Sequence, residues 1–275
     1  MPSARERRYE SGAVGLRPRA ADAQRAVRFF AHPGAVRRAR AERERLPGGA
    51  AAYGFAERHV PGGCHQLAPE IGPLLERVRD LRPQRICEIG CANGATTLAL
   101  SHSAPTVELM IGVDLFVKNR AILLALRRRA QRMVFVDGPS LGAETLERVR
   151  RALGGAALDV LLIDGDHSYD GALGDFLAYR ELVRDGGLIA FHDIVPDGYP
   201  HDDASAHGPG VSMPPRPGVA WAGDVPRLWS TLSSVFEHET YVADAGQRGF
   251  GIGVLEYRRE AAHDALRDAL AAAAP

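Results

Sequence analysis

The sequence predicts an α/β protein with a doubly wound, mostly parallel sheet, a helical cap before the sheet and an antiparallel hairpin after it. Three observations support this prediction. Five short apolar runs alternate with helical patterns between residues 85 and 193, each run has a polar residue at or next to its end, and a glycine turn follows the first run. Because continuous apolar strands need cover on both faces, the helices between them predict a parallel sheet that is covered on both sides.

The first 65 residues are expected to form an N-terminal arm and a helical cap. Helices are predicted over residues 21–30 and 34–46. Glu42 and Glu44 interrupt the arginine run at residues 37–45, which favours a solvated helix face over an anion-binding or partner-binding surface. Pro47, Gly48 and Gly49 end this region, and a helix over residues 70–81 follows from apolar positions at i, i+3, i+4 and i+7 spacing.

The alternating region is predicted to form the sheet and its crossover helices. Strands are expected over residues 86–89, 108–113, 133–136, 158–163 and 188–191, with helices over 95–101, 120–131, 142–153 and 169–183 and a turn at 185–187. Right-handed crossovers bring the carboxyl ends of such strands to one edge of the sheet, where ligands bind. The polar residues that end these strands should meet there, namely Asp114, Asp137, Asp164, His192 and Asp193.

The chain after the fifth strand begins with a long irregular segment, residues 196–223. A loop of this length in a compact domain is usually functional or disordered. Its His201, Asp202, Asp203 and His207 are interpreted as solvated rather than as a substrate or second metal cluster, and Trp221 could stack on an acceptor ring. A helix over 224–236 with Trp229 in the core, a hairpin of strands 240–242 and 250–255, and a terminal helix over 261–274 complete the chain. The predicted domains are 1–65, 66–258 and 259–275.

Composition excludes several classes of protein. The chain has 275 residues, 45% hydrophobic and 25% charged, with a formal net charge of zero, so nothing in it argues for a nucleic-acid or membrane-surface partner. Cys64, Cys87 and Cys91 are interpreted as buried or turn residues in a reducing compartment rather than as metal or redox groups. No run reaches the length of a membrane span and the N-terminus has no apolar signal region, so a cytoplasmic protein is expected.

The turn after the first strand has the pattern Glu88-x-Gly90-x-x-x-Gly94. Its glycines let the backbone pass close to a ligand, but the spacing differs from the G-x-G-x-x-G dinucleotide fingerprint and argues against an NAD oxidoreductase. Asp114, at the end of the next strand, could accept hydrogen bonds from a ribose diol. The alternative is that a strand-end aspartate only caps the following helix.

The order of these motifs resembles a known enzyme family. E-x-G-x-x-x-G, the strand-end Asp114, D-G-x-S at 137–140, I-D-G-D-H-S-Y at 163–169 and G-G-L-I-A-F-H-D at 186–193 resemble the Rossmann-like class I S-adenosylmethionine-dependent methyltransferases. Within this superfamily the chain is similar to the metal-dependent O-methyltransferases of sugar and natural-product hydroxyls, a group that also resembles catechol O-methyltransferase. The resemblance covers about residues 66–257, without the loop that follows Asp193.

The resemblance implies a role for each motif. Gly90, Cys91 and Gly94 would lie against the methionine part of the cofactor, with Glu88 at the end of the same strand. Asp114 would bind the ribose. The loop after the third strand, Asp137, Gly138 and Ser140, would lie near the adenine.

Asp164, His192 and Asp193 would hold a divalent cation, with His192 where relatives often have an acidic ligand. A histidine with two aspartates suits Mn, Fe or Zn, and Mg with added waters is the alternative. His192 could instead be a hydrogen-bonded core residue.

Methyl transfer to a neutral hydroxyl needs a base, and two neighbours of Asp164 are candidates. Asp166 and His167 both follow it closely, and His167 is preferred because its near-neutral pKa suits a general base. The expected acceptor is a hydroxyl of a sugar or other polar small molecule. The alternatives are a metal-independent N- or O-methyltransferase, an NAD-type oxidoreductase and a nonenzymatic partner protein. The oligomeric state is open, and exchange of the basic N-terminal helices between subunits would make a homo-oligomer.

Overall fold

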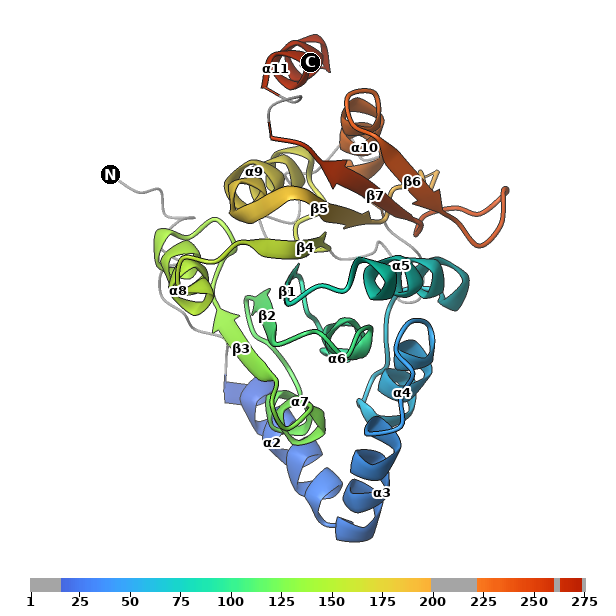
Figure 1. The fold of residues 1–275 in the computed structure, drawn as a ribbon, viewed down its shortest axis with the longest axis vertical. Helices are drawn as coiled ribbons and strands as arrows, with labels where there is room; N and C mark the ends of the chain where they lie inside the picture. The colour runs from blue at the N-terminus through green and yellow to red at the C-terminus, as the bar shows by residue number, and fades with distance from the viewer. Residues whose placement is uncertain (1–15, 199–221, 260–262, 274–275) are drawn as a thin grey trace.

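A computed structural model of the chain describes residues 16–198, 222–259 and 263–273. Its centre is a seven-stranded sheet with the order β3-β2-β1-β4-β5-β7-β6 (Figure 1). The strands are β1 (Arg85–Ile89), β2 (Leu109–Asp114), β3 (Arg132–Asp137), β4 (Leu158–Ile163), β5 (Val183–His192), β6 (His238–Tyr241) and β7 (Ile252–Tyr257).

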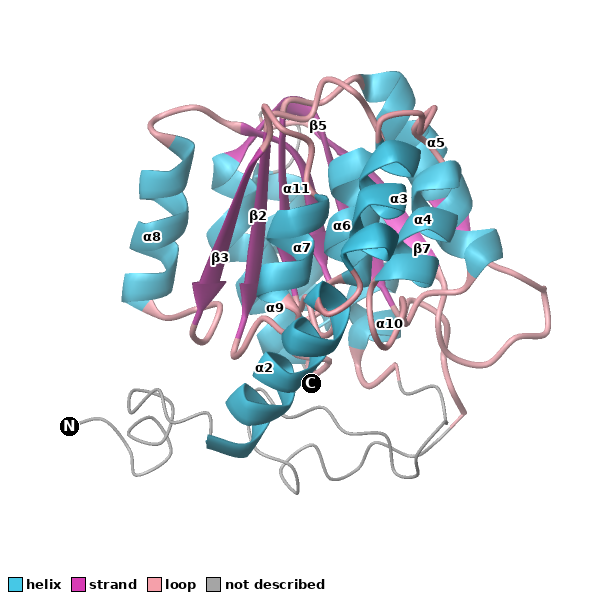
Figure 2. Ribbon diagram, turned by 90° about the horizontal axis from the view of Figure 1, so that it is seen from below, coloured by secondary structure: helices cyan, strands magenta, loops and turns pink. Residues whose placement is uncertain are grey.

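The first five strands are parallel, and β7 pairs antiparallel with both β5 and β6. The strand order reverses between β1 and β4, which is the point where doubly wound sheets bind ligands. In Figure 2, β2 and β3 run side by side to the same edge of the molecule. The predicted Rossmann-like sheet with a C-terminal antiparallel hairpin is confirmed.

Helices cover both faces of the sheet. One face packs against α4 (Ala51–His59), α5 (Ala68–Leu81), α6 (Ala95–His102) and α7 (Arg120–Leu126). The other face packs against α8 (Ala143–Leu153), α9 (Tyr169–Tyr179), α10 (Val225–Ser233) and α11 (His263–Ala273). No helix in the described part of the chain is long and apolar enough to cross a membrane.

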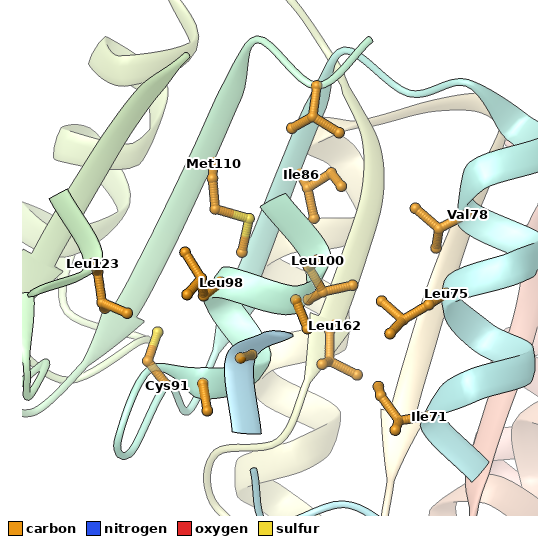
Figure 3. Close-up of a cluster of buried hydrophobic side chains, with 14 of the residues drawn as sticks. Ile71, Leu75, Val78, Ile86, Cys91, Leu98, Leu100, Met110, Leu123 and Leu162 are labelled. Carbon is orange, nitrogen blue, oxygen red and sulfur yellow. The ribbon is translucent and has the colours of Figure 1, made fainter. Parts of the chain in front are cut away.

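The core on the α5 side follows the predicted amphipathic pattern. Ile71, Leu75 and Val78 of α5 are fully buried and point toward the sheet, where Ile86 of β1 and Leu162 of β4 lie opposite them (Figure 3). Burying one side chain of this size stabilises the fold by about 1.5–3 kcal/mol. On the other face, Trp229 of α10 is buried beside Phe191, which confirms its predicted core position.

The N-terminal helices differ from the prediction in extent. The first, α2, spans Leu16–Phe30 and the second, α3, spans Pro33–Arg43; they meet at an angle below α7 (Figure 1). No sequence pattern predicted α4, a nine-residue helix with a glycine inside it. Such a short segment has little helical stability of its own, and α4 is held by tertiary packing of Phe55 in the core.

Several element boundaries also differ. The helix predicted to reach residue 131 ends at Leu126, where the Arg127 guanidinium donates to the Gln131 carbonyl (2.6 Å) and closes the turn into β3. The helix predicted over residues 169–183 ends at Tyr179 and continues as the 3₁₀ helix η1 (Arg180–Leu182).

The turn predicted at residues 185–187 lies inside β5. Val183 pairs with Leu158 and Leu188 pairs with Val160, so the residues between them bulge from the ladder. The cluster of His201, Asp202, Asp203 and His207, and also Trp221, lies outside the described residues.

Candidate active site

The glycine turn after β1 lies directly against the end of β4. Gly90 has a φ of 88°, and a Cβ added there would overlap the carbonyl oxygen of Asp164. Gly94 has a φ of 80°, and a Cβ added there would meet the side chain of Leu123 of α7. Both positive φ values favour glycine, and at Gly90 only glycine also allows the close contact with the Asp164 backbone.

A small pocket opens beside this turn. One wall comes from the loop before α5, and the other comes from the turn, the start of α6 and the end of β4. The residues that line it are Gly63, His65, Gln66, Gly90, Cys91, Ala92, Asn93, Ala95, Thr96 and Asp164. Asn119 fastens the two walls together, because its amide donates to the carbonyls of Pro61 and Asn93, each at 2.9 Å.

The aspartates that end β2 and β3 accept hydrogen bonds from backbone amides of neighbouring loops. Asp114 accepts hydrogen bonds from the amides of Ala92 (2.8 Å) and Phe116 (2.9 Å), which ties the glycine turn to the end of β2. Burial raises the pKa of Asp114, against the lowering effect of these two bonds. Asp137 accepts from the guanidinium of Arg120 at 2.5 Å.

The loop after β3 is held from two sides. Gly138 adopts a φ of 145° and packs on Thr145 of α8, while the Tyr179 hydroxyl donates to the Ser140 carbonyl at 2.8 Å. Asp137, Gly138 and Ser140, which are predicted to lie near the adenine, are therefore at the same edge of the sheet as the glycine turn. Their contact with a cofactor stays a prediction.

Glu88 and Cys91 point their side chains into the protein. Thr97 of α6 donates a hydrogen bond to the Glu88 carboxylate, whose other oxygen is buried with no hydrogen-bond partner among the described residues. Burial raises the pKa of Glu88 to about 8. The Cys91 thiol is turned to the Val113 carbonyl, and burial raises its pKa well above the usual value. Cys91 lines the pocket, whereas the Glu88 carboxylate contacts α6.

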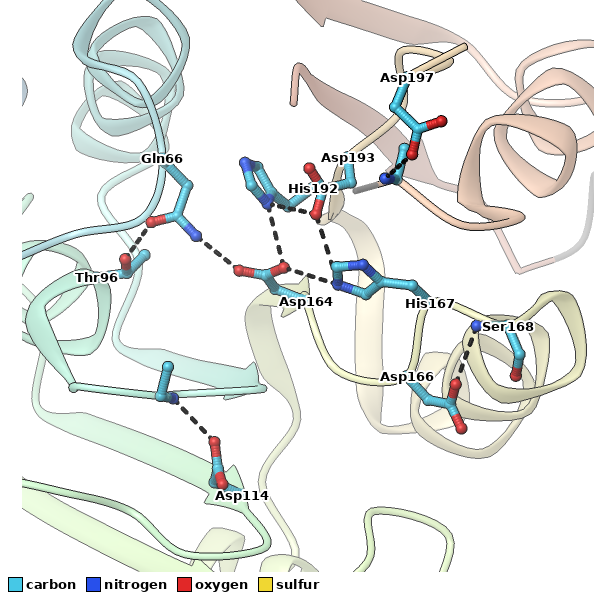
Figure 4. Close-up of polar contacts among 12 residues, drawn as sticks. Gln66, Thr96, Asp114, Asp164, Asp166, His167, Ser168, His192, Asp193 and Asp197 are labelled. Atoms are coloured by element: carbon cyan, nitrogen blue, oxygen red, sulfur yellow. Dashed lines mark hydrogen bonds and ion pairs between the residues drawn. The ribbon is translucent and has the colours of Figure 1, made fainter. Parts of the chain in front are cut away.

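Two aspartates and two histidines meet at the ends of β4 and β5 (Figure 4). The Nδ1 atom of His192 lies 3.1 Å from Asp164 Oδ1 and 3.2 Å from Asp193 Oδ2. The Nε2 atom of His167 lies 3.6 Å and 3.5 Å from the same two oxygens. Two imidazole nitrogens therefore flank one pair of carboxylate oxygens.

The acidic and basic groups of the cluster shift one another's pKa values. Burial alone would raise the pKa of Asp164, but His192 and His167 together lower it well below the usual value. Burial alone would lower the pKa of His192, but Asp164 and Asp193 outweigh this effect and raise it well above the usual value. Opposite charges at such distances favour the ionised form of each partner.

The arrangement fits a metal ion. Asp164, His167 and Asp193 offer ligand atoms that all lie within 4.8 Å of one another, and the His192 nitrogen is at comparable distances from both carboxylates. Mixed nitrogen and oxygen donors are typical of sites for Mn, Fe or Zn. Asp193 reaches this position with a φ of 61°, a left-handed backbone that is strained for a residue other than glycine.

The structure separates the two predicted base candidates. His167 belongs to the cluster, and its carbonyl accepts from the Asp224 amide (2.8 Å), which positions the loop. Asp166 points away from the cluster toward the start of α9, where it accepts from the Ser168 amide at 2.9 Å (Figure 4).

Comparison with known proteins finds one family model that matches the central part of the chain. Residues 87–194 match the model of a family described as a methyltransferase domain. This segment of the chain is therefore similar to methyltransferase domains. The match covers the glycine turn and the acidic and histidine cluster, which consists of Asp164, His167, His192 and Asp193. It supports the resemblance seen in the sequence. No curated protein sequence matches the chain.

Solved structures share the fold of this chain. Cofactor-bound Rv0187 from MTB has 20% sequence identity and a TM-score of 0.51, over 76% of this chain and 88% of that chain. The O-methyltransferase from Bacillus cereus in complex with SAH has 18% identity and a TM-score of 0.50, over 74% and 86% of the two chains. At these identities the similarity shows the fold.

Three polar residues outside the sequence motifs complete the candidate site, and the sequence did not predict them. Gln66 and Thr96 line the pocket, and Asn119 ties the pocket walls together. Asn119 has a φ of 53° and directly precedes α7, a position that a helix-start signal could have suggested. No local pattern marks Gln66, because its partner is 98 positions further along the chain.

Proposed function

We propose that this protein is an O-methyltransferase that moves the methyl group of S-adenosylmethionine to a hydroxyl of a sugar or other polar natural product, with the help of a divalent cation. One observation carries the proposal: the glycine turn and the acidic and histidine cluster share a wall, because Gly90 packs on the backbone of Asp164. A methyl donor at the turn and an acceptor oxygen at the cluster would therefore be neighbours. Alignment of this kind is worth about 7–11 kcal/mol of the barrier in favourable cases.

The donor would lie along the edge formed by the ends of β1, β2 and β3. The turn at Gly90 and Gly94 leaves room for the methionine part, and Asp114 has a carboxylate at the next strand end for the ribose hydroxyls. Asp137, Gly138 and Ser140 would border the adenine. These assignments are supported by the shared edge and by the methyltransferase family model that this segment matches.

Asp164 and Asp193 would hold the cation with one imidazole as third ligand. A bound divalent cation lowers the pKa of a hydroxyl that it coordinates, which makes the hydroxyl a nucleophile near neutral pH. We assign His192 as the third ligand, because its side chain is only 4% exposed and lies closest to both carboxylates. The His167 side chain is 15% exposed and would take the proton from the incoming acceptor.

Methyl uptake by a panel of nucleotide sugars and glycosylated metabolites tests the proposal. We expect transfer to a hydroxyl, loss of turnover with a chelator, and recovery when Mn²⁺ or Mg²⁺ is added. A full rate in chelator would contradict the cation's role and favour metal-independent transfer with His167 as base. Transfer only to nitrogen would contradict the acceptor class.

Replacement of Asp164 separates the cation site from the donor site. Asp164→Ala is expected to abolish turnover and to leave donor affinity, measured by calorimetry, nearly intact, because the glycine turn contacts the backbone of Asp164 rather than its carboxylate. Asp80→Ala changes an exposed aspartate of α5 and serves as the control. A large loss of donor affinity in Asp164→Ala alone would show that Asp164 binds the donor.

A further inference from the structure

Gln66 connects the loop before α5 to the acidic and histidine cluster. Its side chain is buried, with the residue 4% exposed. The Nε2 amide donates to Asp164 Oδ2 at 2.6 Å, and the Thr96 hydroxyl of α6 donates to the Gln66 carbonyl oxygen (Figure 4). The side chain therefore bridges the first turn of α6 and the end of β4.

The two contacts determine which way the Gln66 amide points. Because the Asp164 carboxylate can only accept, the Gln66 amide nitrogen must face it, and the Gln66 carbonyl oxygen then faces Thr96, whose hydroxyl donates to it. Oδ2 of Asp164 is then occupied by Gln66, while Oδ1 lies 3.1 Å from His192 Nδ1. One oxygen of the Asp164 carboxylate therefore contacts Gln66, and the other faces the two histidines.

We infer that Gln66 is a positioning residue that holds Asp164 with a single oxygen, Oδ1, turned toward the cation site. The inference rests on the proposed function and deepens it, since it explains how the cation site is oriented from outside the methyltransferase motifs. Gln66 also lines the donor pocket, so the same side chain borders both parts of the site. Asn93 holds this loop through a bond from its amide to the Gly62 carbonyl (3.3 Å).

The loss of Gln66 should appear in cation binding without any turnover. Gln66→Met keeps the volume of the side chain and removes both hydrogen bonds. We expect Mn²⁺ binding to the purified protein, followed by electron paramagnetic resonance, to weaken about 10- to 100-fold, the usual effect of losing a partner that orients a metal ligand. Thr96→Val, which removes only the hydroxyl that orients the amide, should weaken binding in the same direction and by less.

Gln247 offers a matched control. Its amide donates to the buried Glu70 carboxylate at 2.6 Å, the same kind of contact away from the cluster. Gln247→Met should therefore leave Mn²⁺ affinity at the wild-type value.

The outcomes separate the inference from the proposed function. Wild-type Mn²⁺ affinity in folded Gln66→Met, or an equal loss in Gln247→Met, overturns the positioning role and leaves the proposed function standing. If Gln66→Met does not fold, Thr96→Val decides in the same way. Wild-type protein that binds no Mn²⁺ overturns the proposed cation and the inference with it.

Discussion

Glu88 should make the stability of this protein fall as the pH rises through neutrality. The residue is fully buried on the α6 side of β1, and one of its carboxylate oxygens has no hydrogen-bond partner among the described residues. Burial raises its pKa from the usual 4.5 to about 8 in the folded protein. The folded state therefore keeps the proton over a pH range in which the unfolded chain has already released it.

The size of the effect follows from this pKa difference. A pKa shift of one unit corresponds to about 1.36 kcal/mol, so a shift from 4.5 to about 8 corresponds to about 5 kcal/mol as an order of magnitude. Because the folded-state pKa is raised, this stability is fully present below pH 4.5 and is lost as the pH rises through about 8. Glu88→Gln, which resembles the protonated side chain, should not show this loss.

Urea unfolding followed by circular dichroism between pH 5 and 9 measures the difference. The free energy of unfolding of Glu88→Gln minus that of the wild type should be small at pH 5. It should then grow by about 1.4 kcal/mol per pH unit toward pH 8. Glu147→Gln changes an exposed glutamate of α8 and should run parallel to the wild type. Parallel curves for Glu88→Gln and the wild type would refute the reasoning, because they would mean that Glu88 does not stay protonated in the fold.

Two further substitutions test the turn and the core. Gly90→Ala should abolish donor binding, measured by calorimetry with S-adenosylhomocysteine, because its Cβ would overlap the Asp164 carbonyl at a positive φ. Wild-type affinity in this variant would show that the turn does not form the donor site. Leu75→Ala should lower the free energy of unfolding by about 2–5 kcal/mol, because the side chain is fully buried against the sheet. A loss below about 1 kcal/mol in urea unfolding would contradict the packing described for α5.

Local sequence patterns predicted the sheet because strand and helix formation depend mainly on the spacing of apolar residues within each segment. Continuous apolar runs specify buried parallel strands, and the 3.6-residue period of residues 70–81 specifies α5. Given right-handed crossovers, the strand ends had to share an edge, so Asp114, Asp164 and Asp193 could be placed there from the sequence. The short helix α4 has no comparable signal and forms through packing.

The tertiary structure decided what each side chain at that edge contacts. Glu88 lies near the end of β1, on the face of the strand that packs on α6, so its carboxylate is buried there. Asp166 and His167 are adjacent in the chain, yet only His167 reaches the cluster. Gln66 contacts Asp164 across 98 positions because packing of α4 and α5 brings its loop over α6. Sequence periodicity describes neighbours within an element, whereas such contacts depend on how whole elements pack together.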